Sequence, residues 1–279
     1  MQNTSIPVAA AGFQEMWQPV YDKYKLFFDC GTKVGPIVHE MFTTPIEGPL
    51  LIITGHILAA AVNSYGAVLT LALNGYGHDA LIIARSIYEA EINILWLKNH
   101  PDDVHDFIDY NHIQTKQLYD NMDDDLKTTV SKERLEQIMG DYQRVLPRFA
   151  SGHDKTLPRN QWCRVSIYQR AKDAEAHWQK QLEAEGNAGQ SISLYKTFYW
   201  HASSLHHLDI AGVIAHMDSD MNAQFAPLWE HVDDALMSSS ASILRAIDYF
   251  NDMAKLGLGA RLKEGPVADF LSAYKNLSQ

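Results

Sequence analysis

The chain has 279 residues, 46% of them hydrophobic, and a formal net charge of −11. A chain of this length can bury a large core without covalent staples, and only two cysteines, Cys30 and Cys163, are present, which excludes a disulfide framework. The negative charge argues against general attraction to DNA or to anionic membranes, and no signal-like leader is seen, so we expect a cytoplasmic protein.

Apolar residues recur at helical spacing along the chain, and no segment has the alternation of a strand. After a flexible leader at 1–12, helices are predicted at 13–41, 50–73, 79–98, 102–121, 123–139, 161–185, 191–217, 227–256 and 266–277. Gly31 and Gly35 should weaken or kink the first helix. Residues 140–160, rich in Gly, Pro and Arg, should form a long loop.

These elements predict an all-α fold, a single multi-helix bundle of about seven to nine helices with a long apolar central helix. We expect a helical domain at 13–258 and a C-terminal extension at 259–279 that holds a short helix.

The central helix lies in a stretch, 48–77, that has no Asp, Glu, Lys or Arg. Its length would suffice to span a bilayer. However, it contains His56, Asn63 and Ser64, and it lacks basic residues close to either end. A helix buried inside a bundle is therefore the favoured interpretation, and no membrane contact is expected.

Charge is unevenly distributed along the middle of the chain. Residues 102–125 hold eight aspartates and one lysine, whereas residues 141–172 hold seven basic residues and two aspartates. We expect the two stretches to pair with each other on the surface. The alternative is that the basic residues line a groove for an anion or for RNA.

Two rows of polar residues interrupt stretches that otherwise resemble core. The first row is Arg85, Glu89 and Asn93, and the second is Tyr195, Tyr199, Ser203 and His207. Residues four apart share one face of a helix, so each row must be satisfied by partners, by water or by a ligand.

The first row lies on a helix that is apolar on nearly all sides, so we expect Arg85 and Glu89 to lie inside the protein. They form either a structural ion pair or a site in which Arg85 binds an anion and Glu89 orients it or acts as a base. In the second row, Ser203 lies one turn before His207, whose imidazole is the candidate proton carrier. Structural hydrogen bonding between helices is the alternative.

The candidate catalytic residues are therefore Arg85, Glu89 and His207. The candidate ligand-binding residues are Tyr199, Ser203, Asn93, Tyr195 and His206.

A metal site is not expected from the histidine spacing. The residues His201, His206, Asp209, His216 and Asp218 lie close in sequence, but they match no metal-binding motif. The pair His78 and Asp79, with His56 upstream, resembles the pattern of metal-dependent HD phosphohydrolases. We interpret this resemblance as coincidence and Asp79 as a helix cap. No cofactor motif occurs either.

Three short motifs occur in a fixed order: GYGHDALIIARSIYEA with Arg85, Ser86 and Glu89, NQWCRVSIYQRA with Trp162 and Ser166, and YWHASSLHH with Tyr199, Ser203 and His207. In this order they resemble a bacterial family known as domain of unknown function 5677, over roughly residues 50–217. The resemblance implies a soluble helical protein with no established activity, and it joins the two polar rows in one pattern. His206 and His207 both compete for the family's histidine, and His207 keeps the four-residue step from Ser203.

A more distant analogy is to higher eukaryotes and prokaryotes nucleotide-binding (HEPN) domains, helical proteins of which many are RNases. Those domains place an Arg and a His on one helix, whereas Arg85 and His207 lie on different predicted helices. By analogy, His207 would act as general acid or base, Arg85 would stabilise the phosphorane and the basic segment 144–172 would hold the strand.

Two hypotheses follow. In the first, a polar pocket between the helices at 79–98 and 191–217 binds a small anionic or nucleotide-like ligand or RNA, with metal-independent RNase or hydrolase activity in defence or stress response. In the second, the protein is a non-catalytic interaction protein, a homodimer, and the two polar rows are structural.

Overall fold

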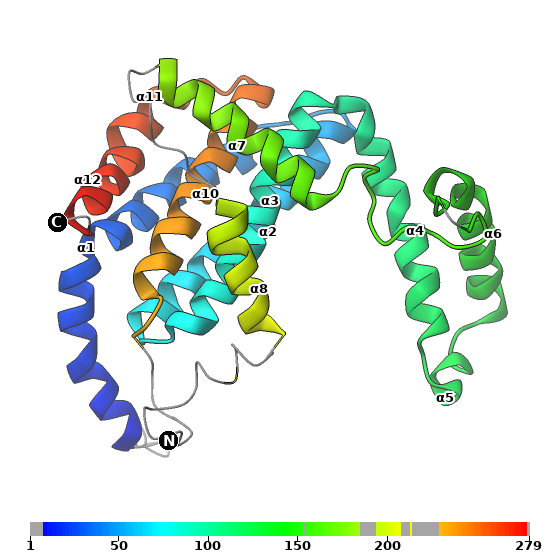
Figure 1. Ribbon diagram of the computed structural model, residues 1–279, viewed down its shortest axis with the longest axis horizontal. Helices are drawn as coiled ribbons and strands as arrows, with labels where there is room; N and C mark the ends of the chain where they lie inside the picture. Colours follow the sequence, from blue (N-terminus) through cyan, green and yellow to red (C-terminus); the bar gives the residue numbers. More distant parts are fainter. Residues whose placement is uncertain (1–7, 153, 185–193, 208–212, 214–228, 278–279) are drawn as a thin grey trace. The chain divides into compact units, whose positions relative to one another are not determined.

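The computed structural model describes residues 8–152, 154–184, 194–207, 213 and 229–277, and this part of the chain is largely helical and contains no β-strand (Figure 1). The α-helices are α1 (Val8–Thr43), α2 (Pro49–Leu73), α3 (Gly77–Asn99), α4 (Val104–Asp120), α5 (Asp124–Lys127), α6 (Lys132–Phe149), α7 (Ile167–Ala184), α8 (Trp200–His206), α10 (Val232–Ala254), α11 (Gly259–Leu262) and α12 (Ala268–Leu277). A 3₁₀ turn, η1 (Pro101–Asp103), and two π-helical turns, η2 (Tyr195–Tyr199) and η3 (Lys263–Val267), complete the set. The predicted all-α class is confirmed.

The chain divides into two compact units, one of residues 1–98 and 170–279 and the other of residues 99–169. The composition of the sequence does not reveal this division.

In the larger unit, α10 packs along α2, while α1 contacts α2, α10 and α12 (Figure 1). The contact between α2 and α10 includes buried small polar residues: the Tyr65 hydroxyl lies 2.9 Å from Ser240 Oγ. Neighbouring serines on α10, such as Ser239, are also fully buried. Small side chains let two helices approach closely. A serine hydroxyl can also donate a hydrogen bond to a carbonyl of its own helix, as the Ser238 hydroxyl does to the Asp234 carbonyl.

The apolar helix α2 is buried along one face only. Its buried residues recur every three or four positions: Thr54, Gly55, Leu58, Ala61, Tyr65, Val68 and Ala72. The expectation of a buried helix is therefore right for that face and wrong for the rest, where Ile52 is 42% exposed. By length and composition alone, α2 could cross a membrane, and 28% of its most apolar window is buried.

In the smaller unit, α4 packs against α6, and the acidic and basic stretches pair as predicted. Arg148 is bonded through Nη1 to Asp106 at 3.2 Å and through Nη2 to Asp109. Arg159 Nη2 also approaches Asp106, at 3.8 Å. Carboxylates of this unit thus engage arginines of the basic segment, which lowers the positive charge available for RNA.

The kink in α1 lies at Tyr24, where φ is −107° and ψ is 17°, and not at the two glycines. Gly31 instead permits a close approach to α2, because a Cβ on it would lie 2.5 Å from Leu69 Cδ1. The expectation of a kink at Gly31 or Gly35 was therefore wrong.

Helix boundaries also differ from those predicted, and the helix expected at 123–139 is divided between α5 and α6. The long loop expected at 140–160 is helical as far as Phe149, since α6 runs through Gly140 and Pro147. Burial of Val145 and Phe149 on one face favours the helix over the local preference of these residues. Likewise, α10 begins at Val232, whereas the start predicted near residue 227 lies outside the described residues.

Candidate functional site

Arg85 of α3 meets residues of η2 and α8. Its Nη1 donates a hydrogen bond to Ser203 Oγ at 3.1 Å, and its guanidinium carbon lies 5.5 Å from the centre of the Tyr199 ring. Its Nε lies 3.5 Å from Glu89 Oε1, which is an ion pair but is longer than a hydrogen bond. Arg85, Glu89, Tyr199 and Ser203 thus converge, and we call these four residues the Arg85 centre.

The Arg85 centre is only partly buried. The side chain of Arg85 is 19% exposed and that of Glu89 is 37% exposed, so the prediction that both lie inside the protein was wrong for Glu89. The helix α3 is not buried on all sides, because Asp79 and Ser86 are exposed. Solvent, and therefore a ligand, can reach this carboxylate.

Tyr199 links the Glu89 carboxylate to η2. Its hydroxyl donates a hydrogen bond of 2.8 Å to Glu89 Oε1. Burial, followed by the negative charge of Glu89, raises the pKa of Tyr199, so the phenol stays protonated and remains a donor. Oε1 of Glu89 is consequently approached both by the Tyr199 hydroxyl and by the Arg85 guanidinium.

Tyr195 supports Tyr199 from the preceding turn. The two rings are stacked with centroids 4.8 Å apart and planes inclined by 17°. The Tyr195 backbone N–H donates to Glu175 Oε1 on α7 at 2.8 Å. These two tyrosines span η2, and π-helical turns are found often at functional sites.

Asn93, the third residue of the first row, has a different partner. Its Oδ1 accepts a hydrogen bond from Nη1 of Arg170, a buried residue of α7. The predicted supporting role of Asn93 at the ligand site stays a prediction, since the contact that we observe joins α3 to α7.

His207 lies at the end of α8, and its side chain is exposed. Its ring packs against that of His206, with centroids 5.1 Å apart, and its backbone N–H donates to the Ser203 carbonyl at 3.1 Å. Among the hydrogen bonds and ion pairs of the described residues, none joins the imidazole of His207 to the Arg85 centre. The structure therefore places both histidines one turn beyond Ser203.

A second Arg–Glu pair, which the sequence reasoning missed, lies deeper in α3. Glu91 is fully buried, and its carboxylate accepts hydrogen bonds from Nε and Nη2 of Arg245, the latter at 3.0 Å. Arg245 also lies over the Trp178 ring, 4.1 Å from its centroid. Burial raises the pKa of Glu91, and Arg245 opposes that shift. This pair joins α3 to α10 and has the structural role that was one of the two interpretations of Arg85 and Glu89.

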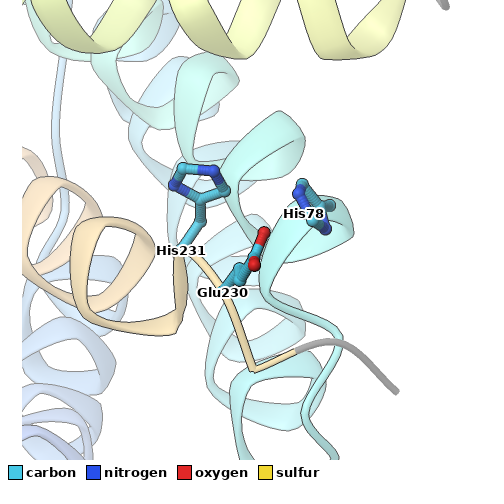
Figure 2. A group of neighbouring side chains, drawn as sticks. All are labelled: His78, Glu230 and His231. Atoms are coloured by element: carbon cyan, nitrogen blue, oxygen red, sulfur yellow. The ribbon is translucent and has the colours of Figure 1, made fainter. Parts of the chain in front are cut away.

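The sequence motifs also do not reveal a group of two histidines and one glutamate. His78, Glu230 and His231 each place one ligand atom within 4.8 Å of the others (Figure 2). His201 Nε2 lies 3.3 Å from His231 Nε2, and burial, together with His231, lowers the pKa of His201. Of the residues that lie close to His201 in the chain, Asp209, His216 and Asp218 lie outside the described residues.

The motif around Trp162 and Ser166 has structural roles. Ser166 Oγ accepts a hydrogen bond of 3.2 Å from the Gln169 backbone N–H in the first turn of α7, and the Trp162 ring packs on Phe107 with centroids 5.1 Å apart. An N-terminal serine of this kind satisfies a backbone donor that the helix leaves unpaired.

The fold and the Arg85 centre define an all-α protein with a partly exposed polar site between helices. The chain belongs to the Family of unknown function (DUF5677), whose model matches residues 51–225. The match includes all four residues of the Arg85 centre as well as His78 and His201, whereas Glu230 and His231 lie beyond it. No curated protein and no solved structure matches the chain significantly.

Proposed function

We propose that the protein binds a small anionic ligand, of the nucleotide or phosphate-ester class, at the Arg85 centre. The proposal rests on the hydrogen bonding of the Arg85 guanidinium. Its Nε is buried and, apart from the ion pair of 3.5 Å with Glu89, makes no hydrogen bond to any described residue, although its neighbours hold the group in place. Buried donors are nearly always satisfied in proteins, so such a donor calls for a partner.

The neighbours of Arg85 hold its guanidinium in position but leave some of its N–H donors without a hydrogen bond. Ser203 takes one N–H at 3.1 Å, Tyr199 lies 5.5 Å from the guanidinium carbon, and Glu89 stays 3.5 Å away. A guanidinium offers five donors in a planar fork that matches phosphate oxygens, and orientation before binding lowers the entropic cost of binding. The hydroxyl of Ser203, which accepts from Arg85, can donate its own proton to an anion, whereas that of Tyr199 donates to Glu89.

A hydrolytic activity on RNA or another phosphate ester, in defence or stress response, extends this proposal. His207 would supply the acid or base and Arg85 would stabilise the charge of the transition state. His207 lies one helical turn from Ser203, which supports this role. No metal ion is part of this step.

The competing proposal is a structural one, in which the Arg85 centre only ties α3 to η2 and α8 in a non-catalytic interaction protein. The hydrogen bond from Tyr199 to Glu89 favours it, because that bond already joins two elements without any ligand.

Calorimetric titration with AMP, ATP and inorganic phosphate tests the two proposals. Arg85→Ala should weaken binding by about 10- to 100-fold, as expected for loss of a charged hydrogen bond, with little change in melting temperature. Arg261→Ala removes an arginine that is paired with Glu40 on the surface, and it serves as the matched control. If none of these anions binds and Arg85→Ala lowers the melting temperature strongly, the structural proposal is favoured.

The hydrolytic extension has its own test. A fluorophore-labelled RNA should be cleaved by the unaltered chain and by Arg261→Ala, but not by His207→Ala. Cleavage at an unchanged rate by His207→Ala would remove His207 from the mechanism while leaving the binding proposal intact.

A further inference from the structure

His78 and the pair Glu230–His231 come together from segments that are 152 positions apart in the chain. His78 lies in the first turn of α3, and His231 directly precedes α10. In Figure 2 the carboxylate of Glu230 lies between the two imidazole rings. Because one ligand atom of each residue lies within 4.8 Å of the other two, a single ion could contact all three after small movements.

The backbone fixes this arrangement. A Cβ on Gly77 would lie 1.8 Å from the Glu230 carbonyl oxygen and 2.8 Å from the Val232 nitrogen, so only glycine fits there. His231 has a left-handed conformation with φ of 64°, which is rare for a residue other than glycine. Strained residues of this kind concentrate at functional sites, where the surrounding structure holds them in place.

Asp234 determines which nitrogen of His231 is available. Its Oδ2 lies 2.9 Å from His231 Nδ1, so that nitrogen donates to the carboxylate and Nε2 is left with a free lone pair. A carboxylate behind a histidine is the usual support of a metal-binding imidazole.

His201 offers a further nitrogen donor beside His231, although it is not one of the three residues whose ligand atoms lie within 4.8 Å of one another. Its Nε2 lies 3.3 Å from His231 Nε2. Two nitrogens bound tetrahedrally to zinc at about 2.0–2.1 Å would be separated by about 3.3–3.4 Å. The observed separation therefore fits a shared ion as well as it fits a hydrogen bond between the two rings.

We propose that His78, Glu230 and His231, with His201 as fourth donor, bind a divalent transition-metal ion of the zinc class. Imidazoles with one carboxylate suit such ions, whereas calcium and magnesium prefer sites made of oxygen ligands. Glu230 is exposed and gives the ion access from solvent, while His78 is only 3% exposed. This proposal does not depend on the proposed anion site, because it uses none of the residues of the Arg85 centre.

The experiment uses tag-free full-length protein that has been stripped with a chelator and titrated with Zn²⁺. We expect one ion per chain, a higher melting temperature with zinc, and no comparable effect of Mg²⁺ or Ca²⁺. Titration with Co²⁺ should give the visible absorption of a tetrahedral nitrogen and oxygen site. Failure of the unaltered chain to take up stoichiometric zinc would overturn the proposal.

Variants locate the ion. His231→Asn keeps a side chain that tolerates the left-handed backbone and should lower zinc affinity by more than about 100-fold, while Asp234→Asn should lower it by about 10- to 100-fold. His177→Gln, on a half-buried histidine of α7, is the matched control and should bind zinc normally, as should Arg85→Ala. Zinc binding by His231→Asn with unchanged affinity and stoichiometry would place the ion elsewhere and refute the assignment.

Discussion

The two Arg–Glu pairs of the larger unit allow a direct comparison of a structural pair with a candidate functional one. Glu91 is fully buried and is held by two hydrogen bonds from Arg245, whereas Glu89 is 37% exposed and lies 3.5 Å from Arg85 Nε. Removing one partner of a buried pair leaves an uncompensated charge, which costs about 3–5 kcal/mol. Arg245 keeps 28% of its side chain exposed and can recover some hydration, so we expect the lower end, about 3 kcal/mol, for Glu91→Ala.

For a chain of this size, that loss corresponds to a decrease in melting temperature of roughly 6–12 °C. Glu89→Ala should cost about 1 kcal/mol, because its ion pair is partly exposed and it gives up one hydrogen bond from Tyr199. Scanning calorimetry measures both variants and resolves separate transitions if the two compact units unfold independently.

A double variant removes both charges by replacing Glu91 with leucine and Arg245 with methionine. Together with the single variants Glu91→Leu and Arg245→Met, it completes a double-mutant cycle. Because the isolated charge is then gone, the double variant should be more stable than Glu91→Ala. Equal destabilisation by Glu91→Ala and Glu89→Ala, or a loss below about 1 kcal/mol for Glu91→Ala, would refute the distinction between the two pairs.

Three further predictions concern local structure. Gly77→Ala should destabilise the protein by about 1–3 kcal/mol in thermal unfolding because its Cβ meets the Glu230 carbonyl, whereas Gly140→Ala in α6, with open space around it, should be neutral or stabilising. Burial and the charges of Lys98 and Lys180 lower the pKa of His177, so its contribution to stability is present above about pH 6.5 and is lost as the pH falls. The unfolding free energy of His177→Gln should thus fall less steeply between pH 7 and 5 than that of the unaltered chain; parallel curves would contradict this. Ser166→Ala should cost about 1 kcal/mol in urea unfolding through loss of the α7 cap, and Ser166→Thr should restore most of it.

The sequence predicted the helices and the shared helical faces because both depend on local spacing, whereas the family resemblance predicted that the two polar rows meet. The four-residue steps place Arg85 and Glu89 on one face and Tyr199 and Ser203 on another, and the family pattern links the two faces. Residue spacing does not show how deeply a side chain is buried. Glu89 and Glu91 are two residues apart on one helix and so point to different sides, and only the packing of α10 shows that Glu91 is the buried residue.

The histidine cluster could not be predicted for a related reason. His78 and His231 belong to segments that are far apart in the chain, and local motifs of metal sites use ligands within a few residues of each other. The available signal was indirect: a glycine-rich turn before His78, in which Gly77 is required by the Glu230 backbone and not by the turn alone.

One helix, α3, organises these groups by its periodicity. His78 and Arg85 are seven residues apart, close to two full turns, so they lie on the same side of the helix, about 10 Å apart along its axis. Glu89 follows on that side one turn later, whereas Glu91 lies on the other side and anchors α3 to α10. The side that carries the candidate ligand groups is therefore separate from the side that carries the structural ion pair. Because of this division, substitutions at the proposed anion and metal sites can be interpreted without loss of the contact that holds α3 in place.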